Sequence, residues 1–237
     1  MAVLESARAK LRPAGQWAST FVRFRPGPTP LIGPIEVRVA DWSRPQAGHA
    51  PMFDTPWLER LSVAHPAFPF AIYAPGGVWL LWRAWQDGFG AGTLAAAYAG
   101  GLLIWSLLEY VAHRGSFHHV PTTEGQVAYG YLVHGVHHAY PDDSRRWVMP
   151  LIVTLPIAAV LFGVSVLALG RLGPPVFAGF IHGYLTYDLL HYFIHRGRMP
   201  TRLGRFLRQY HMTHHYASPE RHFGVSSPFW DVVFRTK

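Results

Sequence analysis

The stretch Tyr187-Asp-Leu-Leu-His191-Tyr-Phe-Ile-His195 is followed by His211-Met-Thr-His214-His215. If both stretches are helical, residues four apart lie above one another, so their histidines are paired on one face. Two earlier segments also contain closely spaced histidines: His113-Arg-Gly-Ser-Phe-His118-His119 and His134-Gly-Val-His137-His138. Because neutral imidazole is the commonest protein ligand of zinc, copper, iron and nickel, four such clusters predict more than one bound metal ion.

The histidines divide into those with ligand-like spacing and those without it. Spacing alone does not decide between His118 and His119, whereas the isolated His49, His65, His182 and His222 are expected to have other roles. A catalytic metal keeps an open position, so ten imidazoles suit two metals of about five ligands each. The ten candidate ligands are His113, His118, His134, His137, His138, His191, His195, His211, His214 and His215.

Composition indicates a membrane protein. Half of the 237 residues are hydrophobic, only 14% are charged, and the mean hydropathy is +0.11. Four apolar stretches, 68–85, 91–112, 147–169 and 175–194, are each close to the length that crosses a hydrocarbon core. Their short connectors predict two helical hairpins. Because the chain has no cysteine, any metal must be held by nitrogen or oxygen.

The basic residues are placed asymmetrically around these stretches. The net charge is +8, and of the 21 Lys and Arg residues all but Arg83 and Arg171 fall on one predicted side of the bundle. The positive-inside rule makes that side cytoplasmic, with both termini and the metal site on it. Basic residues that flank membrane spans are attracted by anionic lipids, so we expect no nucleic-acid partner. The run Asp142-Asp143-Ser-Arg145-Arg146 is expected to be a solvated loop at the interface.

Two of the apolar stretches carry polar residues at helical spacing. They are Ser106, Glu109 and His113 on the second stretch, and Tyr184, Asp188, His191 and His195 on the fourth. Ionisable groups inside a span are costly, so they should face the bundle interior and serve a function. Glu109, Asp188 and Tyr187 are expected to contact the ligand histidines without binding the metal themselves. A carboxylate in such a place would accept the second ring N–H of a histidine.

The histidine pattern resembles the fatty acid hydroxylase superfamily, and within it the fatty acid 2-hydroxylases. The matching phrases are Glu109-Tyr-Val-Ala-His113-Arg114, His134-Gly-Val-His137-His138, Tyr187-Asp-Leu-Leu-His191-Tyr-Phe-Ile-His195 and Tyr210-His211-Met-Thr-His214-His215-Tyr216, and the ending 223–234 is also similar. The resemblance covers about residue 68 to the end. It implies that the ten histidines are the metal ligands, and it favours His118 over His119.

The resemblance also implies an activity. It predicts a membrane-bound oxygenase with two irons, in sites that zinc can occupy in isolated protein, which uses O2 to hydroxylate the 2-position of fatty acids or fatty acyl chains. Yeast and animal relatives carry a fused haem domain that delivers electrons. The first 66 residues are too short and too rich in proline for such a domain, so we expect a separate electron-donor protein.

The predicted fold is therefore all-α, with four transmembrane helices capped by a cytoplasmic histidine-rich helical metal domain. Residues 1–66 are expected to form an irregular Pro/Arg-rich arm, and residues 67–237 the membrane-embedded hydroxylase domain. Three alternatives remain open: a sterol or carotenoid hydroxylase or desaturase of the same superfamily, a non-catalytic protein stabilised by zinc, and a zinc hydrolase of membrane lipids. Lipid product analysis, metal analysis and O2 consumption would separate them.

Overall fold

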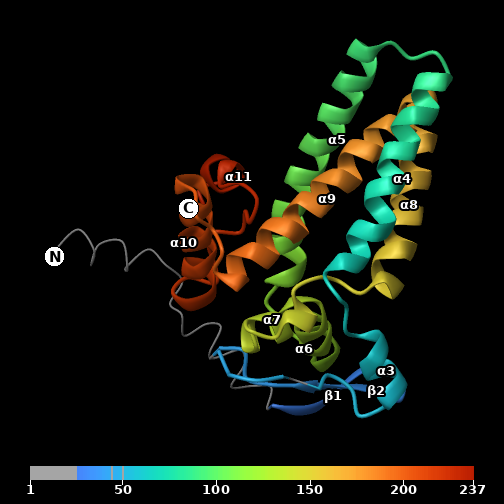
Figure 1. The fold of residues 1–237 in the computed structure, drawn as a ribbon. Helices are drawn as coiled ribbons and strands as arrows, with labels where there is room; N and C mark the ends of the chain where they lie inside the picture. The colour runs from blue at the N-terminus through green and yellow to red at the C-terminus, as the bar shows by residue number, and fades with distance from the viewer. Residues whose placement is uncertain (1–25, 44, 50) are drawn as a thin grey trace.

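The protein is described by a computed structural model that covers residues 26–237 apart from residues 44 and 50. Four long helices form a bundle, some of the shorter helices lie at one end of it, and the last two helices of the chain lie beside it (Figure 1). The long helices are α4 (Ala67–Gln86), α5 (Ala91–Ala112), α8 (Leu151–Leu169) and α9 (Gly173–Arg196). They lie where the sequence predicts helices, and each pair is joined by a short connector, 87–90 or the 3-10 turn η4 (Gly170–Leu172).

Two stretches of the described chain are long and apolar enough to cross a membrane. They are Ala91–Phe117 and Ser144–Arg196, and the second runs through α8 and α9 together. The helix α4 is present as expected but is not part of either stretch. The chain is thus mostly helical and carries apolar helices suited to a membrane.

The helix α9 is the centre of the bundle and packs against α4, α5 and α8. Its closest approach is to α5, where glycines face backbone. A side chain on Gly101 would overlap the backbone of α9 at Val176, and one on Gly179 would overlap that of α5 at Tyr98. Small residues allow apolar helices to approach closely. Glu109 and His113 of α5 are thereby brought to the same interior as Asp188 and His191 of α9. Ser106 faces outward instead and accepts from the indole of Trp230.

A tight turn brings the last ligand-bearing helix beside α9. Gly197, with φ of 75°, ends α9 in the left-handed conformation that favours glycine. The next helix, α10 (Arg202–Tyr216), begins at Thr201, whose side chain accepts a hydrogen bond from the N–H of Gly204 at 3.0 Å. These two caps direct the histidines of α10 back toward the end of α9.

The remaining short elements form the cap of the bundle and its C-terminal segment. They are α3 (Pro56–Leu61), the π-helical turn η1 (His113–Phe117), α6 (Glu124–Gly130), the π-helical turn η2 (Tyr131–Gly135), α7 (Val136–Ala139), the 3-10 turn η3 (Ser144–Arg146) and α11 (Phe229–Val233). π-helical turns are rare and occur mainly at functional sites. Both of them carry candidate metal ligands.

The expectation of an irregular arm and of an all-α fold is wrong for the described part of residues 1–66. β1 (Gly27–Ile32) and β2 (Ile35–Val39) form an antiparallel hairpin, and α3 follows it. Pro28 and Pro30 argued against a strand, but both strands of a two-stranded sheet are edges, where proline is tolerated. Val37 packs in a buried cluster with Val127 of α6, so the hairpin belongs to the cap. Residues 1–25 lie outside the described part of the chain.

The loop around residues 142–146 also differs from its prediction. Asp143 and Arg146 are buried rather than solvated. Asp143 accepts from the guanidinium of Arg145 through both carboxylate oxygens, at 2.9 Å each. Arg146 donates to Glu59 Oε1 at 2.5 Å and to the carbonyl of Ser62 at 2.7 Å. Arg146 thus joins the run to α3, whereas Asp142, Ser144 and Arg145 are exposed as predicted.

Candidate metal centre

The first pair of candidate ligands depends on a π-helical turn. In an α-helix, five residues advance by about 500°, which would point His113 and His118 in different directions. At the end of α5 the helix widens, and the N–H of His118 donates to the carbonyl of His113, five residues back, at 3.1 Å. The two imidazole rings then lie 5.0 Å apart between centroids. His119, the next residue, points away and bonds the carbonyl of Ser116 at 2.8 Å.

The second motif supplies ligands in two directions. His134 and His138, four residues apart, point the same way, and their Nε2 atoms are 2.9 Å apart. At about 100° per residue, His137 is turned about 60° from His134 and about 100° from His138. Its Nε2 instead lies 2.9 Å from Nε2 of His191 on α9. Adjacent histidines in the sequence therefore belong to different clusters.

The last motif divides in the same way on α10. Nε2 of His211 lies 3.0 Å from Nε2 of His215 and 3.1 Å from Nε2 of His195. Nε2 of His214 lies 3.0 Å from Nε2 of His118. The i, i+4 pair of each motif thus joins one cluster, and the histidine between them joins the other.

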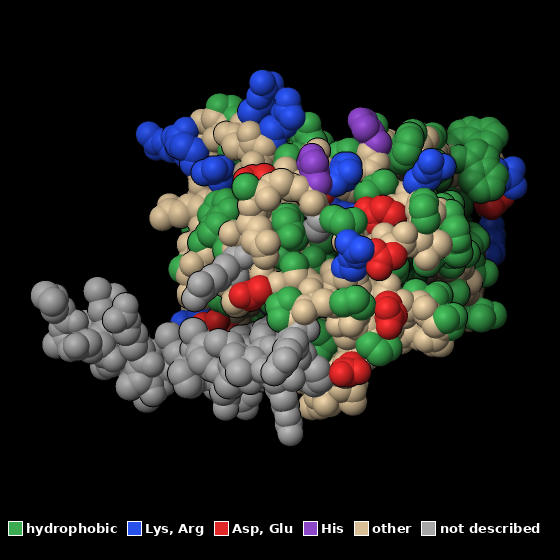
Figure 2. All heavy atoms as spheres, turned by 90° about the horizontal axis from the view of Figure 1, so that it is seen from below, with side chains coloured by type: hydrophobic (Ala, Val, Ile, Leu, Met, Phe, Trp, Pro, Cys, Tyr) green, Lys and Arg blue, Asp and Glu red, His purple; other side chains and the backbone are tan. Residues whose placement is uncertain are grey.

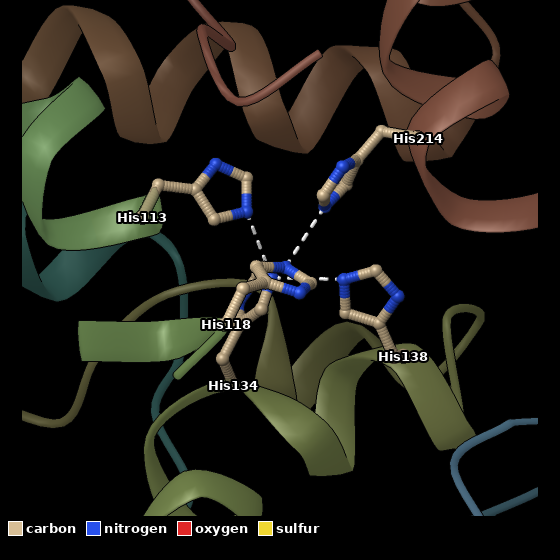
Figure 3. Close-up of side chains that lie close together, drawn as sticks. All are labelled: His113, His118, His134, His138 and His214. Atoms are coloured by element: carbon tan, nitrogen blue, oxygen red, sulfur yellow. Dashed lines mark hydrogen bonds between the residues drawn. The ribbon is translucent and has the colours of Figure 1, made fainter. Parts of the chain in front are cut away.

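The structure gathers the ten candidate ligands into two groups of five. In each group the ligand atoms all lie within 4.8 Å of one another. Group 1, drawn in Figure 3, comes from the end of α5, the cap and α10, and group 2 comes from α7, α9 and α10. Group 1 is His113, His118, His134, His138 and His214, and group 2 is His137, His191, His195, His211 and His215.

Backbone carbonyls fix the tautomer of three rings. Nδ1 of His113 bonds the carbonyl of Phe223 at 2.5 Å, that of His191 bonds Trp147 at 3.0 Å, and that of His214 bonds Arg221 at 2.6 Å. A carbonyl can only accept, so the proton is on Nδ1 in each ring. The Nε2 lone pair then faces the centre of the group, as a metal ligand requires.

The histidines of the cap and of α10 are held neutral. Burial away from water, together with repulsion from the imidazoles of His113 and His191, lowers the pKa of His138 to about 3. Burial also holds the pKa of His134 and of His214 well below its usual range, with repulsion from neighbouring imidazoles in the same direction. Neutral imidazole is the form that binds a metal.

This arrangement fits two bound cations. Several unprotonated nitrogens that point at one another within a buried volume repel, unless a cation lies between them. Nitrogen sets of this kind suit first-row transition metals, and the chain supplies no thiolate. Two metal ions can therefore be held, one by each group. The donor set does not by itself select iron or zinc.

The sequence suggested that Glu109 accepts a hydrogen bond from a ligand ring. Its carboxylate instead supports the backbone segment whose carbonyl accepts from a ligand ring. It accepts from the N–H groups of Val225 and Ser226 at 2.8 and 2.9 Å, and from the hydroxyl of Ser226. This holds the turn that places the carbonyl of Phe223 on His113. The ring acceptors of His113, His191 and His214 are backbone carbonyls, which any residue could supply.

Sequence reasoning missed a second buried carboxylate, Asp231. It accepts from the N–H groups of Phe223 at 3.0 Å and Gly224 at 2.8 Å, and from the hydroxyl of Thr236 at 2.7 Å. Two carboxylates therefore hold the same turn, Asp231 at residues 223 and 224 and Glu109 at residues 225 and 226. The sequence did indicate this carboxylate, as a single aspartate in the apolar run Phe229-Trp-Asp-Val-Val-Phe234. Burial of a carboxylate in such a run is costly unless hydrogen-bond donors are provided for it.

Tyr187 and Asp188 lie directly before the ligand pair of α9. The ring of Tyr187 is stacked on that of His191, with centroids 5.6 Å apart. The carboxylate of Asp188 is buried one turn before His191. His182, further along α9, contacts the hydroxyl of Tyr98 at 3.1 Å and lies outside both groups. It serves helix packing.

Both groups open onto one large apolar cavity of about 650 Å³. His113 and His134 of group 1 line it, as do His137 and His191 of group 2. The rest of the wall is mostly apolar and comes from all four long helices and from the segment 52–62. Tyr187 and Asp188 also line it. A long apolar molecule can thus lie with one end at the histidines.

The fold and the site define a mostly helical protein with apolar helices suited to a membrane and two histidine groups able to hold two metal ions. The chain belongs to the fatty acid hydroxylase family, whose sequence model matches residues 98–236. This confirms the family that the histidine motifs indicated.

Several characterised relatives are similar to the chain. The dihydroceramide fatty acyl 2-hydroxylase FAH1 of Arabidopsis thaliana is 32% identical over 168 residues, which are 70% of each chain. The ceramide very long chain fatty acid hydroxylase SCS7 of Saccharomyces cerevisiae is 38% identical over 143 residues, which cover 57% of this chain and 36% of that protein. The human fatty acid 2-hydroxylase is 34% identical, and 38% of its length is covered.

A solved structure has the same fold. Full-length scs7p, of which only the hydroxylase domain is visible, superposes with a TM-score of 0.74 at 32% sequence identity. The superposition covers 80% of this chain and 72% of that one.

Proposed function

We propose that this chain is a membrane-bound di-iron hydroxylase that acts on the 2-position of fatty acids or fatty acyl chains. The observation that carries the proposal is the pair of five-histidine groups opening onto one apolar cavity. The relatives named above are hydroxylases of fatty acids, dihydroceramide or ceramide, which supports an acyl substrate.

The reaction inserts one atom of O2 into the C–H bond beside the acyl carbonyl, and the other atom leaves as water with two electrons and two protons from a donor. Bound iron supplies the oxygen activation. The ten histidines would hold the metals. Each group offers five nitrogens, more than the four that a closed structural zinc site uses, so the donor set is compatible with a catalytic metal.

The protein's own part is to position the substrate and exclude water. An acyl chain in the cavity would contact Phe180 and Ile181 of α9, and Ile157 and Leu161 of α8, while its carbonyl end lies by the histidines. Tyr187 is proposed to support His191 by stacking on its ring, with the buried Asp188 beside it, and Glu109 to support His113 through the 223–226 turn. The carbon that reacts is set by where the polar end stops.

We place the bundle across a membrane with four spans. Residues 67–237 form the hydroxylase region, and the described part of residues 1–66 closes one wall of its cavity. α8 supports this placement, because Thr154 is its buried residue and Val160 and Leu167 are widely exposed. The cap end of the molecule, which faces the viewer in Figure 2, carries charged side chains of both signs.

The orientation follows from charge. Arg83 and Arg171, the basic residues predicted on the far side, both contact Asp87 at that end of the bundle. The other basic residues of the described chain belong to the metal-binding end and the segments that flank it. We therefore place that end and both termini in the cytoplasm. A separate protein is proposed as the electron donor.

The test is mass spectrometry of total hydrolysed lipids from cells that express the chain. 2-Hydroxy fatty acids should appear with the unmodified chain and with His119→Ala, and should be absent with His214→Ala. His119 is the matched control, because it lies beside the site but outside both groups. Hydroxylated sterols or carotenoids in place of 2-hydroxy acids would contradict the substrate assignment. Unchanged hydroxylation with His214→Ala would contradict the metal role.

A further inference from the structure

We propose that residues 228–234, which include α11 and are here called the C-terminal foot, lie in the bilayer beside α5 and contact lipid acyl chains. This rests on the membrane placement proposed above. The sequence suggested instead that the tail belongs entirely to the cytoplasmic cap. The foot would be an additional membrane contact outside the four long helices.

The polarity of α11 is reversed from that of a helix in water. Its buried residue is the carboxylate Asp231, with no exposed surface. Its outward residues are apolar: Phe229 is 56% exposed, Val232 56% and Val233 50%, and Phe234 just beyond is 45% exposed. A helix in water buries its apolar face. A polar interior with an apolar exterior is instead suited to hydrocarbon surroundings.

The foot is attached to α5 well before that helix ends. The indole N–H of Trp230 donates to the hydroxyl of Ser106 at 3.1 Å. Ser106 is six residues before Ala112, which corresponds to about 9 Å along the helix. The ring of Phe234 stacks on that of Tyr110, with centroids 5.1 Å apart. Figure 1 shows α11 level with the middle of α5. If α5 crosses the bilayer, the foot is at the depth of the acyl chains.

The exposed surface of the foot continues that of α5. Phe229 and Trp230 line one hollow together with Leu103 of α5, which is itself widely exposed. Since α5 lies in a stretch suited to crossing a membrane, the same lipid that covers Leu103 reaches Phe229. The foot is followed by the exposed basic residues Arg235 and Lys237. Long basic side chains reach from such a depth to the headgroups.

The foot also connects the membrane to metal group 1. Asp231 accepts from the N–H groups of Phe223 and Gly224. The carbonyl of Phe223 holds Nδ1 of His113 at 2.5 Å. Seating of α11 in lipid would thus keep the turn, and through it one ligand ring, in place.

The test uses the absence of cysteine from the chain, so that each introduced cysteine is a single labelling site. Val232→Cys reports on the foot, with Val233→Cys as a second position if the first variant does not fold. Leu103→Cys is the control on α5, and Glu124→Cys at the start of α6 is the control in water. Each variant is labelled with a nitrobenzoxadiazole probe and reconstituted in phosphatidylcholine vesicles. Metal bound per chain, compared with the parent protein, checks folding.

We expect doxyl-labelled lipid to quench the fluorescence of the probe at 232 as strongly as that of the probe at 103. Iodide in the water should quench neither of these two probes. The probe at 124 should behave in the opposite way. If iodide quenched the probe at 232 while lipid quenched the probe at 103, the proposal for the foot would be overturned and the membrane placement of the long helices would stand. Quenching at 232 by neither agent would mean that protein, such as a second copy, covers the foot, which also overturns it. Iodide quenching at 103 would instead refute the membrane placement itself.

Discussion

Substitution of Glu109 should impair metal group 1 and leave metal group 2 intact. Its carboxylate is buried and accepts three hydrogen bonds from Val225 and Ser226. In Glu109→Ala these donors lose their acceptor, and a buried donor left unpaired costs about 1–3 kcal/mol. We therefore expect the variant to lose roughly 3 kcal/mol or more of unfolding free energy, since three donors are affected.

The loss of bound metal should be confined to group 1. The turn that Glu109 holds carries the carbonyl that fixes His113, and it follows directly on the carbonyl of Arg221 that fixes His214. Among the ring contacts that the structure describes, none joins this turn to group 2. Glu109→Ala should therefore bind about one metal ion per chain where the parent binds two, with group 2 retained.

The assay is unfolding of the purified, metal-loaded protein in mixed micelles by titration with dodecyl sulfate, together with metal analysis. Glu109→Gln is the matched control, because its amide oxygen still accepts from the two backbone N–H groups. We expect it to cost about 1 kcal/mol, the contribution of one hydrogen bond. If Glu109→Ala kept both the parent stability and both metal ions, the supporting role of this carboxylate would be refuted.

Three further substitutions test the cap and the cavity. In Gly135→Ala the new methyl group would overlap the ring of Trp42, so we expect a loss of about 1–3 kcal/mol in the same unfolding assay, and no loss would mean that the ring moves aside. Arg146→Ala removes the charge partner of Glu59, whose carboxylate keeps two backbone N–H donors, and should cost about 1.5–3 kcal/mol, whereas no loss would mean that the pair is open in solution. Ala158→Trp fills the acyl cavity and should lower hydroxylation of long chains in the lipid assay. Val160→Trp, on the exposed side of α8, should leave it unchanged, and equal effects would argue against this cavity as the substrate site.

The sequence predicts the parts of the site that depend on helical spacing. His191 with His195, and His211 with His215, are paired as the i, i+4 rule requires, and both pairs belong to group 2. His118 could not be chosen by that rule, because its contact with His113 needs a π-helical turn. A local widening of one helix leaves no clear pattern in side-chain type.

Other parts of the site depend on backbone atoms, which every residue possesses. The carbonyls of Phe223, Trp147 and Arg221 fix three ligand rings, and no side-chain pattern marks them. The hairpin 27–39 was missed for a different reason. Prolines usually end strands, and only pairing as an edge makes Pro28 and Pro30 compatible with one.

The central claim is that ten histidines form two metal sites, with His118 rather than His119 in group 1. The most direct test is the number of metal ions bound per chain in the parent protein, in His118→Ala and in His119→Ala, each purified after loading with iron. The account predicts two ions for the parent and for His119→Ala, and fewer for His118→Ala, which loses a ligand of group 1. Full metal content in His118→Ala together with loss of metal in His119→Ala would contradict it.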